Sequence, residues 1–256
     1  MSDKVAFAVV AHPDDIEFMM AGTLILLGQA GFELNYMTVA NGSCGTATQS
    51  KDEIVAIRTA EARSAAEMIG AQYHPPLVGD TEIFYDQVLI SRLCAIVRRV
   101  NPQILLLPSP QDYTEDHIDT SRLMVTAAFL RGVKNYLTDP QMPTVQRDMA
   151  IYHCMPIGLV DQLRRPVRAD AYVDISDVFD QKLRMLKCHR SQKEWLDYSQ
   201  GLDSYLAAME QMSLEIGKRS KKFKYAEGWQ RHLHLGFGPE QFDPLQDALK
   251  NLVIIA

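Results

Sequence analysis

The alternation of apolar runs with helix-spaced segments through the first half of the chain constrains the fold more than any other feature. Residues 5–10 and 104–108 are continuous apolar runs, typical of strands buried on both faces of a parallel sheet. Other apolar residues recur at helical spacing, and Gly31 and Gly70 follow two of these segments as stop signals. This pattern predicts a doubly wound α/β sheet, parallel at least in this half. The expected elements are strands over 4–11, 34–40 and 104–108 and helices over 16–30, 52–69, 87–100 and 117–131.

The second half of the chain is less regular. We expect strands over 150–155 and 171–175, a helix capped by Ser176 that runs to about 189, and a helix over 202–217. The 256 residues contain no internal repeat and no long linker. We therefore predict one domain over 1–256, with a core over 1–140 and an irregular α+β subregion over 141–256.

Composition excludes several classes of function. The net charge is −6 and the only basic tract is residues 218–222, which argues against nucleic acid as a partner. No stretch approaches the roughly 20 apolar residues of a membrane span, and the N-terminus does not have the pattern of a signal peptide. Cys44, Cys94, Cys154 and Cys188 are scattered and form no CxxC pair. They are typical of reduced thiols, so we expect a cytoplasmic protein.

Reactive side chains follow two of the predicted buried strands. His12, Asp14 and Asp15 come directly after the first, and a run from Asp112 to His117 follows the strand over 104–108. If the strand order reverses between these two strands, both groups face one crevice at the carboxyl edge of the sheet. Two histidines and one carboxylate are a common ligand set for a catalytic zinc, and a second carboxylate is then free to act as general base. A plainer interpretation is that Asp14 or Asp15 caps the next helix, and a ligand can do both.

These residues carry a family resemblance. Residues 11–15 (Ala-His-Pro-Asp-Asp) resemble the signature of the LmbE/PIG-L family of zinc-dependent N-acetylglucosaminyl deacetylases, and weaker matches extend over most of the chain. Those matches are Asn41-Gly42, Arg58, Glu61, residues 65–70 and Asp116-His117. The resemblance implies a Rossmann-like fold and hydrolysis of an acetamide on an amino sugar.

The resemblance also implies roles for individual residues. His12, Asp15 and His117 would bind Zn²⁺, although Fe²⁺ or another divalent ion suits the same ligands. Asp14 would be the general base for a metal-activated water that attacks the amide. The matching positions imply that Arg58 and Asp80 contact the sugar, although Arg58 could equally form an ion pair with Glu61 on its own helix.

The chain departs from the family at one position. Many members have a histidine three positions before the last ligand, assigned to the oxyanion or to the leaving amine, whereas this chain has Thr114. Our candidates for that role are His232 and His234, which share one side of an extended segment, and a solvated loop is an equally good interpretation of them. Tyr113 is a weaker candidate, since a phenol can donate to an oxyanion.

Three functions remain open. The first is a metal-dependent hydrolase that removes acetyl from an N-acetylated amino sugar or its conjugate. The second keeps the zinc chemistry but cleaves an amino-sugar thiol conjugate as an amidase. The third is a non-catalytic sugar-binding relative that retains the metal site. In each case a small amino-sugar molecule is the expected partner, and a homo-oligomer is possible by analogy with relatives.

Overall fold

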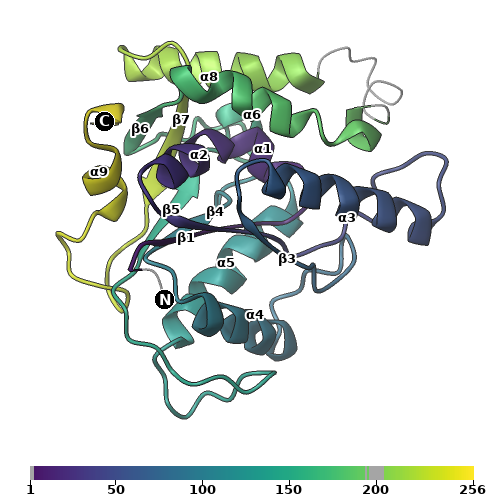
Figure 1. Cartoon of the computed structure of the whole chain (residues 1–256), viewed down its shortest axis with the longest axis vertical. Coiled ribbons are helices and arrows are strands. Elements are labelled where there is room, and N and C mark those ends of the chain that lie inside the picture. Colours follow the sequence, from purple (N-terminus) through teal and green to yellow (C-terminus); the bar gives the residue numbers. More distant parts are fainter. Residues whose placement is uncertain (1–2, 194, 196–204) are drawn as a thin grey trace.

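The computed structural model describes residues 3–193, 195 and 205–256. A single eight-stranded sheet in the order β3-β2-β1-β4-β5-β7-β6-β8 runs through the molecule (Figure 1). The strands are β1 (Val5–Val10), β2 (Glu33–Thr38), β3 (Gln72–His74), β4 (Ile104–Leu107), β5 (Ala150–Cys154), β6 (Ala171–Asp174), β7 (Ala226–Arg231) and β8 (Val253–Ile255). This architecture confirms the predicted α/β class.

The first five strands form the parallel part of the sheet. β1 pairs with β2 on one side and with β4 on the other, and all pairings from β3 to β5 are parallel. The chain moves outward from β1 to β3 and then returns to place β4 on the other side of β1. The strand order therefore reverses between β1 and β4, which meets the condition under which both groups of reactive side chains face one crevice beyond the carboxyl ends of these strands.

Helices cover both faces of this sheet (Figure 1). One apolar core lies under α4 and α5, and the larger core lies on the opposite face under the remaining α-helices. The helices are α1 (Asp15–Met19), α2 (Ala21–Gln29), α3 (Lys51–Glu67), α4 (Gln87–Val100), α5 (Glu115–Leu130), α6 (Phe179–Leu186), α8 (Tyr205–Ser220) and α9 (Pro244–Leu249), with short 3₁₀ turns η1 (Ile157–Leu159), η2 (Ser176–Val178) and η3 (Lys250–Leu252). No helix in these described ranges has both the length and the apolar character that a membrane crossing requires.

Local signals explain the helices that match their predictions. Ser50 and Glu53 form a capping box at the start of α3, and the Asp86 side chain accepts the Leu89 N–H at the start of α4. α4 ends at Asn101 in the left-handed conformation. The predicted helix over 202–217 is observed as α8, and residues 202–204 lie outside the described residues.

Two helix predictions are corrected. The segment 16–30 is two helices that break at Met20. The break lies where the Glu227 carboxylate of β7 binds the first amides of α2, at Gly22 and Thr23, an interaction that local periodicity cannot reveal. Ser176 is not a helix cap, because its hydroxyl donates to Asp174 and the segment starts as η2.

The C-terminal strands extend the same sheet in the antiparallel sense. β7 pairs antiparallel with β5 and with β6, and β6 pairs antiparallel with β8. β7 therefore runs against the parallel strands, and the residues after it leave toward the amino ends of those strands. This direction determines where His232 and His234 lie.

Candidate metal and hydrolase site

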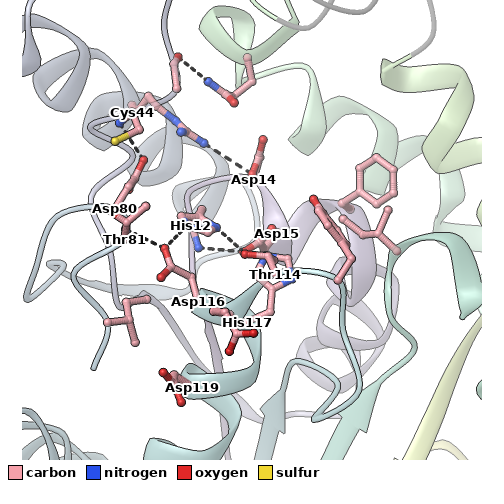
Figure 2. A pocket seen from close by; sticks show the side chains of 18 of the residues that line it. His12, Asp14, Asp15, Cys44, Asp80, Thr81, Thr114, Asp116, His117 and Asp119 are labelled. Carbon is pink, nitrogen blue, oxygen red and sulfur yellow. Dashed lines mark hydrogen bonds and ion pairs between the residues drawn. The ribbon is translucent and has the colours of Figure 1, made fainter. Parts of the chain in front are cut away.

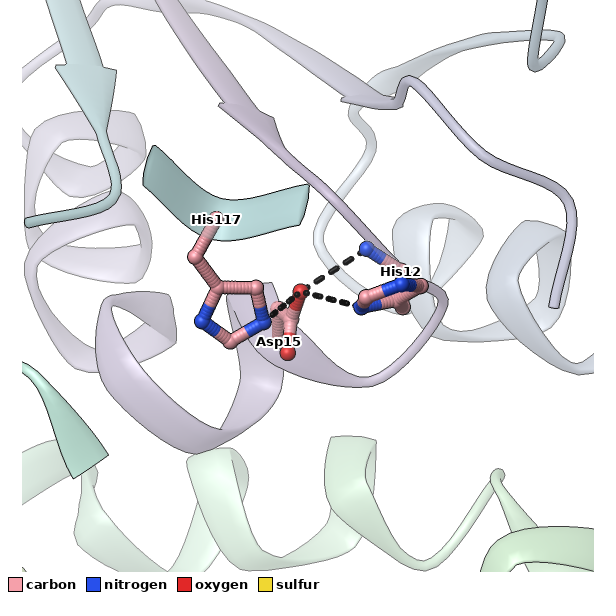
Figure 3. A group of neighbouring side chains, drawn as sticks. All are labelled: His12, Asp15 and His117. Atoms are coloured by element: carbon pink, nitrogen blue, oxygen red, sulfur yellow. Dashed lines mark hydrogen bonds and ion pairs between the residues drawn. The ribbon is translucent and has the colours of Figure 1, made fainter. Parts of the chain in front are cut away.

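Three side chains from the two strand ends converge in the crevice. His12 and Asp15 follow β1, and His117 lies in the first turn of α5 after β4 (Figure 3). The Nε2 atom of His117 is 3.2 Å from Asp15 Oδ2, and the Nδ1 atom of His12 is 3.6 Å from the same oxygen. One ligand atom from each residue lies within 4.8 Å of the others. The sequence prediction that these three residues come together is therefore confirmed.

A second layer of carboxylates holds the two imidazoles in place. The Nε2 atom of His12 is 2.9 Å from Asp116 Oδ2, and the Nδ1 atom of His117 is 3.1 Å from the fully buried Asp112. Carboxylates behind ligand histidines fix the ring orientation and leave the other nitrogen free for a metal. Sequence reasoning gave neither Asp112 nor Asp116 a role, although both lie in the acidic run before His117.

The carboxylates around His12 and His117 favour positive charge on the two imidazoles. Burial alone lowers the pKa of both histidines, but hydrogen bonds with Asp116 and Asp15 raise the pKa of His12 to about 9. The Asp15 and Asp112 carboxylates raise that of His117 to about 10. Burial opposes ionisation of Asp15, but the two histidines outweigh it and hold the pKa of Asp15 far below its usual range. A divalent cation supplies the same charge balance.

The donor set fits a divalent metal. Two imidazole nitrogens and one carboxylate oxygen are the ligands of many catalytic zinc sites, which keep a further position open. The Nε2 atom of His117 and the Nδ1 atom of His12 both lie near Asp15 Oδ2, whereas the other nitrogen of each ring faces Asp112 or Asp116. His12, Asp15 and His117 are thus the residues that could hold a metal.

Asp14 lies beside this group without being part of it. Its backbone has φ = 102°, a left-handed conformation that is uncommon for a non-glycine residue and recurs at functional sites. Asp14 occupies the N-cap position of α1, but its side chain makes no capping hydrogen bond. Instead, Asp14 Oδ2 accepts the hydroxyl of Tyr205 at 2.7 Å, and Oδ1 is 3.6 Å from Arg58.

The surroundings of Asp14 favour its protonated form more than water does. Burial raises the pKa of this carboxyl group, the Arg58 guanidinium opposes that shift, and the charge of Asp15 adds to it. The side chain is positioned by groups from α3 and α8, so it stays next to the ligand cluster. Tyr205 was not singled out by sequence reasoning, because 191 positions separate it from Asp14.

Arg58 and Asp80 organise the loop after β2. The carboxylate of Asp80 accepts the amides of Gly42 and Cys44 at 2.6 and 2.8 Å. Arg58 is buried and donates to the carbonyls of Gly42 and Pro13. The alternative ion pair between Arg58 and Glu61 is wrong, since Glu61 accepts the amide and hydroxyl of Ser191 instead.

A cavity of about 1090 Å³ surrounds the site (Figure 2). Arg58, Asp80, Tyr113 and Thr114 all line it, together with the ligand cluster and Asp14. Tyr113 is 64% exposed at the cavity, and its ring meets that of His117 edge-on. Trp195 also lines the cavity, whereas Trp229 is fully buried, with its ring N–H donated to Thr23.

His232 and His234 do not line this cavity, which corrects the expectation that they complete the site. The antiparallel direction of β7 carries them away, into separate hollows beside β5. His232 Nδ1 lies 3.0 Å from the Nε2 atom of His153, a buried residue at the end of β5. Among the described residues that line the main cavity, the only imidazoles are those of His12 and His117, so no histidine there replaces Thr114.

Comparisons with known proteins agree with this geometry. Residues 7–128 match the family model described as GlcNAc-PI de-N-acetylase (PIG-L). Diacetylchitobiose deacetylase of Thermococcus kodakarensis is 28% identical over 231 residues, 88% of this chain and 82% of the relative. The 4-oxalmesaconate hydratase of Pseudomonas putida is 24% identical over 235 residues, 89% of this chain and 88% of the relative.

A solved structure gives the same result for the fold. The N,N'-diacetylchitobiose deacetylase from Pyrococcus horikoshii superposes with a TM-score of 0.76 at 22% identity, over 93% of this chain and 88% of that one. Its fold contains the same kind of sheet, at an identity too low to carry function. Taken with the residues that converge beyond β1 and β4, the match to the family model shows a PIG-L (LmbE) family domain over residues 7–128.

Proposed function

We propose that the protein is a metal-dependent hydrolase that removes the acetyl group from an N-acetylated amino sugar or its conjugate. The observation that carries this proposal is the position of Asp14. This carboxylate is 13% exposed next to the three-residue cluster, and its own partners, Tyr205 and Arg58, hold it in that position without its being part of the cluster. A site that only binds metal has no need of a carboxylate held in this way.

His12, Asp15 and His117 would hold the metal, for which Zn²⁺ is the leading candidate and Fe²⁺ an alternative. When bound, such an ion makes water more acidic and polarises an acyl carbonyl. Asp112 and Asp116 keep the two imidazoles oriented with one nitrogen each toward the ion.

Asp14 is the proposed general base. Its Oδ2 atom accepts the Tyr205 hydroxyl, so Oδ1 is the atom available to take a proton from the attacking water. The same carboxyl group can then deliver that proton to the leaving amine, as general acid–base groups commonly do. This double use supplies the proton donor that a histidine at position 114 would otherwise provide.

The charges in the cavity favour deacetylation over the hydration reaction of the Pseudomonas relative. Six carboxylates line the described cavity, and the only guanidinium or ammonium group that lines it is Arg58. Such a lining stabilises the ammonium group that deacetylation releases. It repels an anionic substrate such as the one the name of 4-oxalmesaconate hydratase specifies.

We propose substrate contacts for three further residues. Tyr113 is the exposed one and can lie against a sugar face or donate its hydroxyl. Arg58 and Asp80 have protein partners, so they act on the sugar mainly by shaping the loop over Gly42 and Cys44. The four cysteines are free, which supports a reducing compartment such as the cytoplasm.

Release of acetate by the metal-loaded protein tests this proposal. The substrates are N-acetylglucosamine, diacetylchitobiose and a panel of longer N-acyl glucosamines, with 4-oxalmesaconate as the competing substrate. Acetate release that a chelator abolishes supports the proposal and excludes a non-catalytic binding protein. Turnover confined to longer acyl groups identifies an amidase, and turnover of 4-oxalmesaconate alone identifies a hydratase.

The Asp14→Asn variant tests the proposed base. It should retain metal but lose about 10²- to 10⁴-fold in turnover, because an amide cannot accept the proton. Asp52→Asn, the same change on the exposed face of α3, is the matched control. Full turnover in Asp14→Asn would show that the base is another residue.

A further inference from the structure

The segment that follows α6 joins parts of the site that are far apart in the sequence. The amide and hydroxyl of Ser191 donate to the carboxylate of Glu61 on α3, at 2.9 and 2.6 Å. The next residue, Gln192, donates its side-chain amide to the carbonyl of Gly45, in the loop after β2, at 2.9 Å. Gln192 is only 4% exposed, yet it lines the main cavity together with Gly45. The bonds of Ser191 anchor the segment, so that Gln192 is held against the cavity.

The bond to Gly45 determines which end of the Gln192 amide is left for the cavity. A carbonyl oxygen can only accept, so the group that meets the Gly45 carbonyl is the NH2 group of Gln192. The Oε1 atom therefore points away from Gly45. It has no hydrogen-bond partner among the residues that the structure describes, and it is not sealed off from solvent. A buried side chain thus presents a free acceptor to the cavity.

Gly45 permits this arrangement because it lacks a side chain. A Cβ atom at position 45 would lie 2.6 Å from Gln192 Nε2 and closer still to Arg58 Nη1. The amide and the guanidinium therefore pack against the same small residue, and Gln192 has little freedom to turn. An acceptor that is already held in place loses less conformational entropy when it binds a ligand.

The position of Arg58 indicates which part of a substrate reaches Gln192. Its Nη1 atom lies against Gly45, whereas its Nη2 atom is 3.6 Å from Asp14 Oδ1. Arg58 therefore separates Gln192 from the proposed base. Because the amide that is hydrolysed must lie beside Asp14, Gln192 faces another part of the substrate. A neutral acceptor binds a neutral donor, and the neutral donors of an amino sugar outside its amide are the hydroxyl groups.

We propose that Gln192 is a specificity-determining residue whose Oε1 atom accepts a hydrogen bond from one hydroxyl group of the amino sugar. This inference rests on the proposed hydrolase function and adds to it a residue that selects the substrate. A substrate without that hydroxyl leaves a buried acceptor unsatisfied, which is more unfavourable than the loss of a hydrogen bond that water can replace.

Removal of single hydroxyl groups from the substrate identifies the group that Gln192 binds. The panel is N-acetylglucosamine, its methyl glycoside and its 3-deoxy, 4-deoxy and 6-deoxy analogues, each of which lacks or blocks one hydroxyl. For one of these analogues, kcat/KM of the wild type should be about tenfold lower than for N-acetylglucosamine. Equal kcat/KM values for the whole panel would overturn the proposal.

Two variants separate the acceptor role from a role in holding the loop. Gln192→Met and Gln192→Glu both remove the NH2 group that donates to Gly45, but only Gln192→Glu retains an oxygen that can accept. Gln192→Met should therefore hydrolyse the sensitive analogue and N-acetylglucosamine with nearly equal kcat/KM, whereas Gln192→Glu should keep the preference. Gln211→Met, at an exposed position of α8, is the matched control and should behave as the wild type does.

Two results with these variants would contradict the proposal. A preference that survives in Gln192→Met would show that another residue binds the hydroxyl. A preference that is lost in both variants would show that Gln192 acts only by holding the loop at Gly45.

Binding of the product separates this inference from the proposed function. In calorimetry, glucosamine should bind the metal-loaded wild type about tenfold more tightly than one of its matching analogues, and Gln192→Met should bind the two about equally. If this pattern is found and no amide is hydrolysed, the proposed reaction is wrong and the contact with Gln192 stands. If N-acetylglucosamine is hydrolysed and Gln192→Met keeps the full preference, the reaction stands and the contact is wrong.

Discussion

Two pairs of histidines lie in this molecule, and they differ in what stands behind the imidazoles. His12 and His117 are backed by Asp116 and Asp112, and their pKa values are raised to about 9 and about 10 against the effect of burial. His153 and His232 are bound to each other, and burial lowers both pKa values, that of His153 to about 4.

The geometry of the second pair shows why it is not a metal site. The Nδ1 atom of His153 is 2.9 Å from the carbonyl of Pro108, which can only accept, so His153 Nδ1 carries the proton. Its Nε2 atom must then accept from His232 Nδ1. The ring centroids are 5.2 Å apart, which is close to the 3.0 Å nitrogen–nitrogen distance plus the two ring radii. The two nitrogens therefore point at one another and not toward a shared ion.

The comparison shows that the partner of an imidazole decides its chemistry. A carboxylate behind the ring favours positive charge in front of it, whereas a carbonyl and a second neutral ring favour a neutral, structural hydrogen bond. Both pairs lie near the ends of sheet strands, so position alone does not separate them.

Loss of a ligand histidine is expected to have the largest effect on function. His12→Ala and His117→Ala should lose bound metal and reduce acetate release by roughly a thousandfold or more, because a bound metal ion lowers the activation barrier by several kcal/mol. His153→Gln and His232→Gln should retain metal and most of the activity. Metal analysis and an acetate assay measure both properties in each variant. Equal losses of metal and activity in both pairs would show that the carboxylate-backed pair has no special role.

The second pair should reveal itself in stability at acid pH. The pKa of His153 is lowered to about 4 in the folded protein, so between pH 6.5 and 4 the unfolded chain binds more protons. The neutral imidazole therefore contributes stability above pH 6.5, and up to about 3 kcal/mol of it is lost as the pH falls toward 4.

Urea unfolding of the wild type and His153→Gln across this pH range measures that contribution. The variant should be the less stable protein at pH 7, and the gap should narrow toward pH 4. A gap that widens on acidification would mean that His153 is charged in the folded protein, as the first pair is in the absence of metal.

The carboxylates behind the first pair should tune metal affinity. Asp112→Asn and Asp116→Asn should each weaken metal binding by about 10- to 100-fold, because an amide orients and polarises an imidazole less well than a carboxylate. Asp119→Asn is the matched control: this residue lies on α5 in the same cavity and pairs with Arg122. Competition with a chelating dye gives the metal affinities. Unchanged affinities in Asp112→Asn and Asp116→Asn would contradict the conclusion that the carboxylates behind His12 and His117 favour metal binding.

The smallest expected effect concerns the position of the base. Tyr205→Phe removes one hydroxyl that donates to Asp14 and should lower kcat by about tenfold with little change in KM or metal content. Tyr225→Phe removes a similar bond, to Glu210, and should leave kcat unchanged. Equal kcat values in the two variants would mean that Arg58 alone positions Asp14.

The sequence predicted the parts of the fold that local pattern determines. The apolar runs of β1 and β4 and the capped helices α3 and α4 match their predicted positions to within a few residues. The convergence of His12, Asp15 and His117 was predicted for the same reason, since these residues follow buried strands whose carboxyl ends meet at one edge.

Long-range interactions determine what the sequence could not predict. The break at Met20 lies where Glu227 of a distant strand binds the start of α2, and Tyr205 reaches Asp14 across most of the chain. The error over His232 and His234 had a similar cause. These two residues follow the end of β7 in an irregular segment, and only the pairing of β7 with β5 reveals that the strand before them runs in the opposite direction.

The distance along the chain between Asp14 and Tyr205 has a consequence for how activity arises during folding. The three residues proposed as ligands are all present once residue 117 has been synthesised. Asp14, the proposed base, gains its tyrosine partner only when α8 docks, because Tyr205 lies 191 positions further along the chain. Contacts between residues so far apart tend to form late, because the entropy of closing the intervening chain must be overcome first. A newly made molecule should therefore acquire its capacity for metal before it acquires its full catalytic rate.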